Sequence, residues 1–292
     1  MIITNNHGAP ATLVALANKN YYSKGDSDYS VTELLSPPRV RRLQERHDPS
    51  LKKDVSDMLW ALLGSALHVV AERASAEGHV VEERIIAEVD GVKVSGAIDL
   101  QEMTPDGVVI TDYKFTSAYS VMNEKKEWEE QLNLYKWLVE SVKRIPVKGL
   151  KICALIRDFS RHDRRENYPE SPIHMVDIPM WDSVKAEAFV RARLHLHAEA
   201  KFADAMEDPL PPCSAEERWF SETTYAVKKE GRKTAVRVFK TIEEANELAT
   251  KEKAHYVEVR VGEPRRCTGN YCNVAEHCDQ WQSEVRAGSA ET

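Results

Sequence analysis

Two aspartates and a lysine stand around a short turn, where they could bind a cation and activate water. Asp99 closes the sequence Gly-Ala-Ile-Asp, and Asp112 and Lys114 stand two residues apart in the sequence Asp-Tyr-Lys. Carboxylate oxygens suit Mg²⁺ or Mn²⁺, and a lysine beside them can orient or deprotonate a water molecule. An exposed ion pair is the simpler alternative for the Asp-Tyr-Lys triplet taken alone.

A hairpin is needed to bring these side chains together. Residues 92–100 and 108–115 are rich in β-branched and apolar side chains, and the sequence Pro-Asp-Gly at 105–107 favours a turn between them. Asp99 and Asp112 would then lie near the same end of adjacent strands. Asp112 and Lys114 would leave the same face of one strand, because side chains alternate with a period of two.

Two amphipathic segments flank the hairpin and carry further polar residues. Residues 54–76 have a helical pattern that includes His68 and Glu72, and residues 124–143 have one that includes Gln131 and Tyr135 at i,i+4. Buried polar groups need hydrogen-bond partners, which a bound polyanion would supply. Alternatively, His68 is a satisfied core histidine, Glu72 is a solvated residue or an outer-shell ligand, and Gln131 and Tyr135 are packing residues.

Taken in order, these motifs resemble those of a known family. The chain is similar, over residues 30–159, to the RecB-like branch of the PD-(D/E)XK nucleases. The resemblance is carried by an ordered set of residues: His68, the G-x-x-D motif ending at Asp99, the D-x-K motif of Asp112 and Lys114, and the Q-x-x-x-Y motif of Gln131 and Tyr135.

The resemblance also implies a role for each residue. Metal ligands would be His68, Asp99, Asp112 and the carbonyl of Tyr113. Lys114 would position the attacking water, and Gln131 and Tyr135 would hold either the DNA backbone or Lys114 itself.

A second group of residues, near the end of the sequence, could bind a different metal. Cys267, Cys272 and Cys278 follow one another closely, and Cys213 lies upstream after a proline cluster. Four thiolates can hold an iron–sulfur cluster or a zinc ion. Several RecB-like nucleases carry a [4Fe–4S] cluster on such cysteines, although this chain differs from them in spacing and in the position of its first cysteine.

Alternatives to the iron–sulfur cluster remain open for this cysteine group. Zinc or no metal would also fit the pattern, and His277 could replace one cysteine as a ligand. Cys153, inside an apolar run, is expected to be a small core residue.

Composition agrees with a cytoplasmic enzyme. The chain has 292 residues, of which 42% are hydrophobic and 30% are charged, enough to build one main domain and an appendage. The first residues do not resemble a signal peptide, and no apolar stretch approaches the length of a membrane span. Five cysteines without a secretory signal argue for reduced thiols instead of a disulfide framework.

The net charge of −7 argues against a nucleic-acid partner, since DNA binding usually rests on basic side chains. Charge can nevertheless be local. Three basic groups stand out, each of which is either a solvated surface or part of a binding groove: Arg39, Arg41, Arg42 and Arg46; Arg157, Arg161, Arg164 and Arg165; and Lys228, Lys229, Arg232, Lys233 and Arg237.

The pattern of elements predicts an α/β protein in three parts. Residues 1–29 form a poorly patterned leader, and residues 30–208 form a restriction-endonuclease-like core with a mixed central sheet flanked by helices. Residues 209–292 form a small α+β appendage. It is expected to hold a hairpin turning at Glu230-Gly231, a helix over 242–253, a strand over 256–261 and the cysteine loop.

By resemblance, the chain is expected to be a Mg²⁺- or Mn²⁺-dependent deoxyribonuclease. The family implies an exonuclease acting on DNA ends or single strands in recombination, repair or replication of a phage or mobile element, with a recombination or replication protein as partner. The alternatives are a non-catalytic DNA-binding subunit that keeps the fold and a metal-stapled interaction protein. No membrane association is expected.

Overall fold

The computed structural model describes residues 1–19, 23–71, 73–74, 76–123, 125–269 and 271–290. The chain divides into two compact units. The first comprises Met1–Arg41 and Asp48–Pro209, and the second comprises Arg42–His47 and Leu210–Thr292. Each unit is described below by itself.

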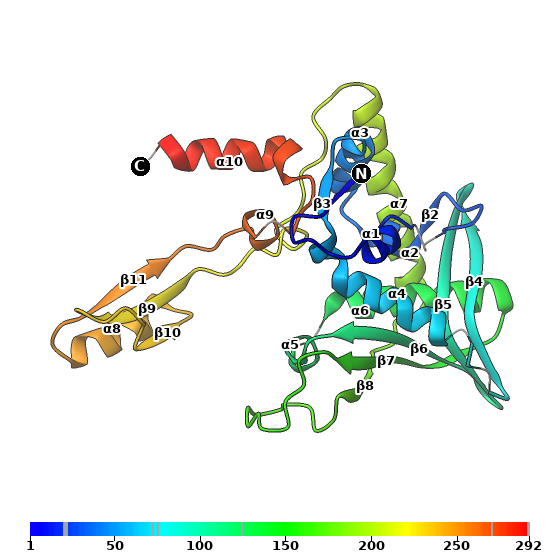
Figure 1. Cartoon of the computed structure of the whole chain (residues 1–292), viewed down its shortest axis with the longest axis horizontal. Helices are drawn as coiled ribbons and strands as arrows, with labels where there is room; N and C mark the ends of the chain where they lie inside the picture. Colours follow the sequence, from blue (N-terminus) through cyan, green and yellow to red (C-terminus); the bar gives the residue numbers. More distant parts are fainter. Residues whose placement is uncertain (20–22, 72, 75, 124, 270, 291–292) are drawn as a thin grey trace. The chain divides into compact units, whose positions relative to one another are not determined.

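A mixed sheet of six strands forms the centre of the first unit (Figure 1). Five of them follow the order β2-β5-β6-β7-β8, and β4 also pairs with β5. The β4–β5, β5–β6 and β7–β8 pairs are antiparallel, whereas β6 and β7 are parallel. The strands are β2 (Tyr29–Ser30), β4 (His79–Val89), β5 (Val92–Thr104), β6 (Gly107–Thr116), β7 (Val147–Ile156) and β8 (Ile173–Asp177).

Helices connect and cover this sheet. The parallel β6–β7 pair requires a crossover, and α6 provides it. The predicted helix over 124–143 is confirmed as α6 with a π turn at its end, whereas the helix predicted over 54–76 is shorter and follows a 3₁₀ turn. The helices are α2 (Val31–Leu35), α3 (Pro38–His47), η1 (Val55–Met58), α4 (Leu59–Ala71), α5 (Ala118–Met122), α6 (Lys126–Leu138), η2 (Val139–Lys143) and α7 (Ser183–Ala205).

The core of this unit lies between the sheet and α6. Ile98 of β5, Ile110 of β6, Ile152 of β7 and Leu132 and Leu138 of α6 are all fully buried. Burial of each such side chain stabilises the fold by about 1.5–3 kcal/mol relative to leaving it exposed. The predicted fold class, a mixed sheet flanked by helices, is therefore confirmed.

The leader is more ordered than its weak pattern predicted. It holds β1 (Ile2–Thr4) and α1 (Ala11–Ala17), and β1 pairs in parallel with β3 (Lys52–Asp54). The Asp54 carboxylate accepts hydrogen bonds from the Thr4 hydroxyl at 3.0 Å and from the Asn6 N–H at 2.8 Å. These hydrogen bonds depress the pKa of Asp54 well below its usual range.

The second unit contains a small sheet of three antiparallel strands in the order β10-β9-β11. The predicted hairpin, helix and strand of the appendage are confirmed, and helical segments follow them in the described residues. These elements are β9 (Thr224–Lys229), β10 (Arg237–Phe239), α8 (Ile242–Lys251), β11 (His255–Arg260), α9 (Arg265–Thr268), η3 (Ala275–His277) and α10 (Asp279–Ala290).

Among the described residues, no helix is long and apolar enough to cross a bilayer.

Candidate active site

The hydrogen-bonded ladders on both sides of β5 are interrupted at Asp99. Towards β4, the pairs Val81–Leu100 and Glu83–Ile98 flank the position, but Glu82 and Asp99 themselves are not paired. Towards β6, pairing ends at Leu100–Thr111, one residue before the two aspartates would meet. The backbone groups and side chains of Glu82 and Asp99 are therefore not used in strand pairing, and they can take part in a binding site.

Asp99 and Asp112 lie close together where β5 and β6 separate. Their side chains are almost fully buried, with residue exposures of 5% and 2%. The Asp99 carboxylate accepts a hydrogen bond of 2.8 Å from the N–H of Tyr113, in place of a strand partner. Because the N–H and C=O of a residue leave the same side of a strand, the Tyr113 carbonyl is also directed towards β5, as its predicted role as a ligand requires.

Lys114 is held in place by hydrogen bonds to its neighbours. Its Nζ donates to Gln131 Oε1 at 3.0 Å and lies 2.6 Å from Asp112 Oδ2. The Gln131 amide in turn donates to Asp112 Oδ1 at 3.2 Å and to the Tyr135 hydroxyl at 2.8 Å. The four predicted residues of the D-x-K and Q-x-x-x-Y motifs thus form one network.

His68 reaches the same place from α4, and it is half-exposed instead of sitting in the apolar core. Its Nδ1 lies 3.0 Å from Glu82 Oε1 and 3.5 Å from Asp99 Oδ1. In the described part of the chain, His68, Glu82 and Asp99 are the group of possible metal ligands whose ligand atoms all lie within 4.8 Å of one another. Glu72, the other candidate on this segment, lies outside the described residues.

Glu82 was not predicted as a site residue. It occupies an unusual backbone conformation, with φ of +50° in the middle of β4. Positive φ in a non-glycine residue of a strand is strained, and such strain concentrates at functional positions.

Gly96, the first residue of the G-x-x-D motif, allows α6 to approach the sheet. A Cβ atom at this position would lie only 2.7 Å from Leu138 and 2.8 Å from the ring of Tyr135. A larger residue would push the helix away, and with it Tyr135 and Gln131.

A cavity of about 380 Å³ connects all these groups. On the edge of β5 that faces β6, the strand pairs with β2 at Val94 and Ser95 and with β6 from Leu100 on, so residues 96–99 between them have no partner strand on this edge. The predicted residues that line it are His68, Asp99, Asp112, Lys114, Gln131 and Tyr135, and Glu82, Arg84, Ser23, Val31, Thr32, Ser65, Val69, Gly96 and Ala97 complete the lining.

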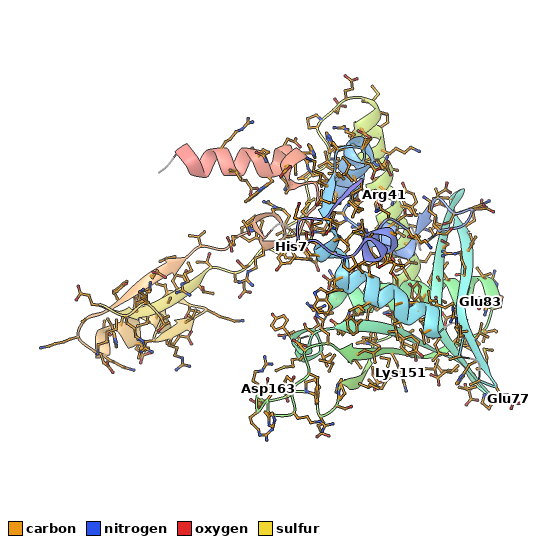
Figure 2. All side chains as sticks on the ribbon, viewed as in Figure 1. His7, Arg41, Glu77, Glu83, Lys151 and Asp163 are labelled. Atoms are coloured by element: carbon orange, nitrogen blue, oxygen red, sulfur yellow. The ribbon has the colours of Figure 1, made fainter. Side chains whose placement is uncertain are left out.

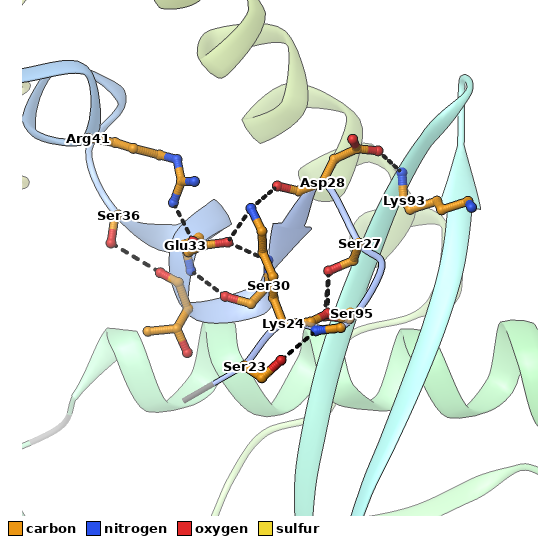
Figure 3. Close-up of polar contacts among 12 residues, drawn as sticks. Ser23, Lys24, Ser27, Asp28, Ser30, Glu33, Ser36, Arg41, Lys93 and Ser95 are labelled. Carbon is orange, nitrogen blue, oxygen red and sulfur yellow. Dashed lines mark hydrogen bonds and ion pairs between the residues drawn. The ribbon is translucent and has the colours of Figure 1, made fainter. Parts of the chain in front are cut away.

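Arg84 adds a second cation to the cavity. Its Nη1 donates to Ser95 Oγ at 3.2 Å. Ser95 is fully buried and fixed by Ser27 Oγ at 2.7 Å and by the Lys24 carbonyl at 3.0 Å, in the network that Figure 3 shows. A cavity with two cations beside a carboxylate pair can receive a phosphate group and a metal ion together.

The electrostatics of the site favour uptake of a cation. Burial, and next the neighbouring Asp112 carboxylate, raise the pKa of Asp99 to about 7. The hydrogen bond to Glu82 raises the pKa of His68, and the Asp99 carboxylate acts in the same direction. A divalent cation would relieve the repulsion between the carboxylates.

This arrangement predicts that the metal-free protein loses stability as pH rises. Between the unfolded pKa of 3.8 and the folded pKa of about 7, folded Asp99 holds a proton that the unfolded chain releases. The free energy of unfolding should therefore fall across this range, and His68 extends the decline above pH 6.5. Thermal unfolding in EDTA at several pH values should show a weaker decline for Asp99→Asn than for the parent. An equal decline in both proteins would contradict the proposed origin of the effect, and Asp106→Asn in the exposed β5–β6 turn is the control.

The four cysteines of the predicted second metal site all lie in the second unit. Cys272 and Cys278 are buried, and Cys213 and Cys267 are half-buried. Burial raises the pKa of the Cys272 thiol, and the nearby Cys267 and Cys278 sulfurs raise it further. The side-chain amide of Gln280 binds the backbone of Cys213 through hydrogen bonds of 2.8 and 3.0 Å.

The structure also shows the surroundings of His277 and Cys153, which the sequence analysis named. The ring of His277 stacks on that of His47, with centroids 3.9 Å apart. Cys153 lies on β7 and is half-buried, with burial raising the pKa of its thiol.

Three of the four residues of the first basic group are not openly exposed, whereas Arg46 is. Arg39 and Arg42 are buried, with exposures of 3% and 9%. Arg41 forms an ion pair of 2.8 Å with Glu33, as Figure 3 shows, and its guanidinium lies over the ring of Tyr29. In the second group, Arg165 pairs with Asp163 and Arg157 lies over Trp60.

Comparison with solved structures finds remote similarity. A structure described as SSO0001 has 16% identity and a TM-score of 0.41, covering 67% of this chain and 90% of its own. A "putative exonuclease" from Eubacterium rectale has 13% identity and a TM-score of 0.29, covering 49% of this chain and 52% of its own. No curated protein matches the sequence.

A family model gives the decisive comparison. The model of the PD-(D/E)XK nuclease superfamily matches residues 21–279, which include every element around the cavity. The chain therefore belongs to the PD-(D/E)XK nuclease superfamily.

Proposed function

We propose that the protein is a Mg²⁺- or Mn²⁺-dependent deoxyribonuclease of the RecB-like type, acting as an exonuclease on DNA ends or single strands. The observation that carries this proposal is the convergence of Asp99, Asp112 and Lys114 with His68 in one cavity. A role in recombination, repair or replication follows from the same resemblance.

The residues present suit a divalent metal ion. Asp112 Oδ2 is buried and, among the described residues, receives no hydrogen bond of acceptable geometry, although Lys114 Nζ is 2.6 Å away. Such an oxygen keeps a lone pair for a cation. Ligands would come from His68, Asp99, Asp112 and the Tyr113 carbonyl, a set dominated by oxygen that hard cations prefer, with one imidazole that suits Mn²⁺.

The proposed reaction is hydrolysis of a phosphodiester by in-line attack of water. A bound metal ion would polarise the phosphate and make the water more acidic. Lys114 would orient that water and offset the charge that develops on the phosphate, because Gln131 fixes its ammonium group. Arg84 would bind a phosphate oxygen at the other side of the cavity.

Glu82 is expected to support the metal ligands by orienting His68. We expect Glu82→Gln to weaken Mn²⁺ binding by about 10–100-fold, the usual effect of removing a carboxylate that holds a ligating histidine. Isothermal titration with Mn²⁺ measures this. Glu83→Gln is the matched control, because Glu83 is the adjacent residue, labelled in Figure 2, and pairs with Lys143 instead. Equal Mn²⁺ affinities for the two variants would show that Glu82 does not support the metal ligands.

The choice between end-directed and internal cleavage is tested with paired substrates. Linear single-stranded and double-stranded DNA, labelled at either end, should be degraded from an end in the presence of Mg²⁺ or Mn²⁺. A closed circular DNA of the same sequence should stay intact. Cleavage of the circle at the same rate would establish an endonuclease, and degradation of RNA alone would overturn the assignment of DNA as the substrate.

We also propose that Cys213, Cys267, Cys272 and Cys278 hold a [4Fe–4S] cluster, with zinc as the alternative. A single tetrahedral zinc ion with Zn–S bonds of about 2.3 Å would place its sulfurs less than about 4 Å apart. The support for a thiolate-ligated metal is that all four cysteines belong to the second unit, where Cys272 and Cys278 are buried.

Loss of a cluster ligand should lower stability before it lowers activity. Metal binding free energy at such a site is folding free energy, because the unfolded chain has no preformed site. Cys272→Ser or Cys278→Ser should therefore reduce soluble yield and the unfolding temperature, whereas Cys153→Ser on β7 should keep the metal content of the parent. Anaerobically purified protein should be brown and bleach on reduction. A colourless protein with one equivalent of zinc would favour zinc, and unchanged stability and metal content would refute the cysteine site.

A further inference from the structure

Charge is segregated within the small sheet of the second unit. Residues 224–240, which form β9, the turn and β10, contain six basic residues and one acidic residue, a net charge of +5. The following segment, residues 241–253 with α8, contains four acidic and two basic residues, a net charge of −2. A chain with net charge −7 thus concentrates positive charge on one hairpin.

Four of the six cations of this hairpin are exposed and lack carboxylate partners among the described residues, whereas Lys228 pairs with Glu258 and Lys240 with Glu222. Lys229, Arg232, Lys233 and Arg237, which we call the basic hairpin, are all exposed. Arg232 Nε donates to the Thr234 hydroxyl at 3.1 Å, and the Arg237 guanidinium lies over the ring of Phe239. Within the described part of the chain, none of the four has a carboxylate within ion-pair distance. Their charge is therefore available to an external anion.

The turn itself is well defined. Gly231 has a φ of +78°, which glycine adopts without strain. The N–H of Glu230 donates to the Ala254 carbonyl at 2.9 Å, and the N–H of Arg232 donates to the Lys229 carbonyl at 3.0 Å. These bonds fix the turn against the start of β11, so Arg232 and Lys233 are presented on a structured tip.

Two cations of the basic hairpin share one face of the sheet. Lys229 stands opposite His255 in the strand register, and Arg237 stands opposite Val227, two residues before Lys229. Arg232 and Lys233 lie in the turn beyond the paired strands. Basic side chains so placed can bind successive phosphates of a backbone whatever its sequence.

We propose that the basic hairpin forms a second contact surface for the sugar–phosphate backbone of a nucleic-acid strand, separate from the catalytic cavity. This inference rests on the proposed function only in taking the polymer to be a nucleic acid. The backbone is a regular polyanion, and each basic side chain that neutralises a phosphate releases counterions. Binding at this surface is therefore expected to depend strongly on salt.

The test measures binding by the full-length protein in EDTA, where the catalytic metal is absent. Fluorescence anisotropy with a labelled single strand, and with its duplex, gives the association constant across a range of salt concentrations. The double variant Arg232→Gln/Lys233→Gln should reduce the slope of log K against log salt by about one for each charge removed.

A matched control removes the same charge outside the second unit. Lys148→Gln/Lys201→Gln, at exposed positions of β7 and α7, should keep the slope of the parent. Equal slopes for the two double variants would overturn the proposal. Loss of binding to an acidic polypeptide but not to DNA would also overturn it, and would identify an acidic protein as the partner.

Failure of this inference is distinguishable from failure of the proposed function. Hydrolysis of a small diester, bis(p-nitrophenyl) phosphate, involves the cavity alone. It should proceed in Mn²⁺ at the parental rate in the hairpin variants. Absence of that hydrolysis in the parent protein would count against the nuclease assignment, whereas unchanged DNA binding in the hairpin variants would count only against the second surface.

Discussion

Replacement of Lys114 by alanine is expected to lower the rate of DNA cleavage by roughly 10²–10⁴-fold, the usual contribution of a group that handles the proton of the attacking water. Its ammonium group is fixed by Gln131 at 3.0 Å and lies beside Asp112. Metal binding should persist, because Lys114 is not a ligand. Single-turnover cleavage of end-labelled DNA in Mg²⁺ measures the loss.

A control lysine on the same sheet isolates the effect of position. Lys93 lies exposed on β5, and Lys93→Ala should cleave at the parental rate. Cleavage by Lys114→Ala at the rate of Lys93→Ala would show that the assignment of the water-positioning residue is wrong.

Replacement of Asp112 by asparagine is expected to abolish both metal binding and cleavage. The change keeps the shape of a side chain that is 2% exposed, but it removes the charge of a proposed ligand. A catalytic metal supplies several kcal/mol, which corresponds to a rate loss of roughly a thousandfold or more. Titration with Mn²⁺ and cleavage assays should fall together, whereas Asp106→Asn in the exposed turn should change neither. Full cleavage by the Asp112→Asn protein would show that Asp112 is not a ligand of the catalytic metal.

Local patterns predicted the hairpin and its chemistry because the turn fixes the register. A short turn between two β-branched runs leaves little freedom, and in the structure Pro105 and Asp106 alone form it, because Gly107 already pairs with Thr104. Asp99 and Asp112 consequently meet. Gln131 and Tyr135 could be assigned to one helix face by spacing alone. The contact of Gln131 with Lys114, one of the two partners that the resemblance implies, is seen only in the structure.

Glu82 was missed although the same reasoning could have found it. The sequence Asp90-Gly91 favours a hairpin turn, and counting back along the two strands from it places Glu82 opposite Asp99. The backbone distortion at Glu82 could not be predicted from the sequence, because a positive φ in a strand depends on the tertiary contacts that hold it.

Contacts between distant parts of the sequence explain the remaining differences. The strand Ile2–Thr4 is short, and its partner Lys52–Asp54 is about fifty residues away, so neither segment has a local signal. The burial of Arg39 and Arg42 likewise depends on packing. A run of basic residues predicts charge but not exposure.

The central claim is that this cavity hydrolyses phosphodiesters with a divalent metal ion. Purified protein should be incubated with end-labelled single-stranded and double-stranded DNA in Mg²⁺, Mn²⁺, Ca²⁺ or excess EDTA, beside the Asp112→Asn variant. The account predicts cleavage only by the parent protein and only with Mg²⁺ or Mn²⁺, with Ca²⁺ supporting binding without turnover. Full cleavage in excess EDTA, or no cleavage under any of these conditions, would contradict it.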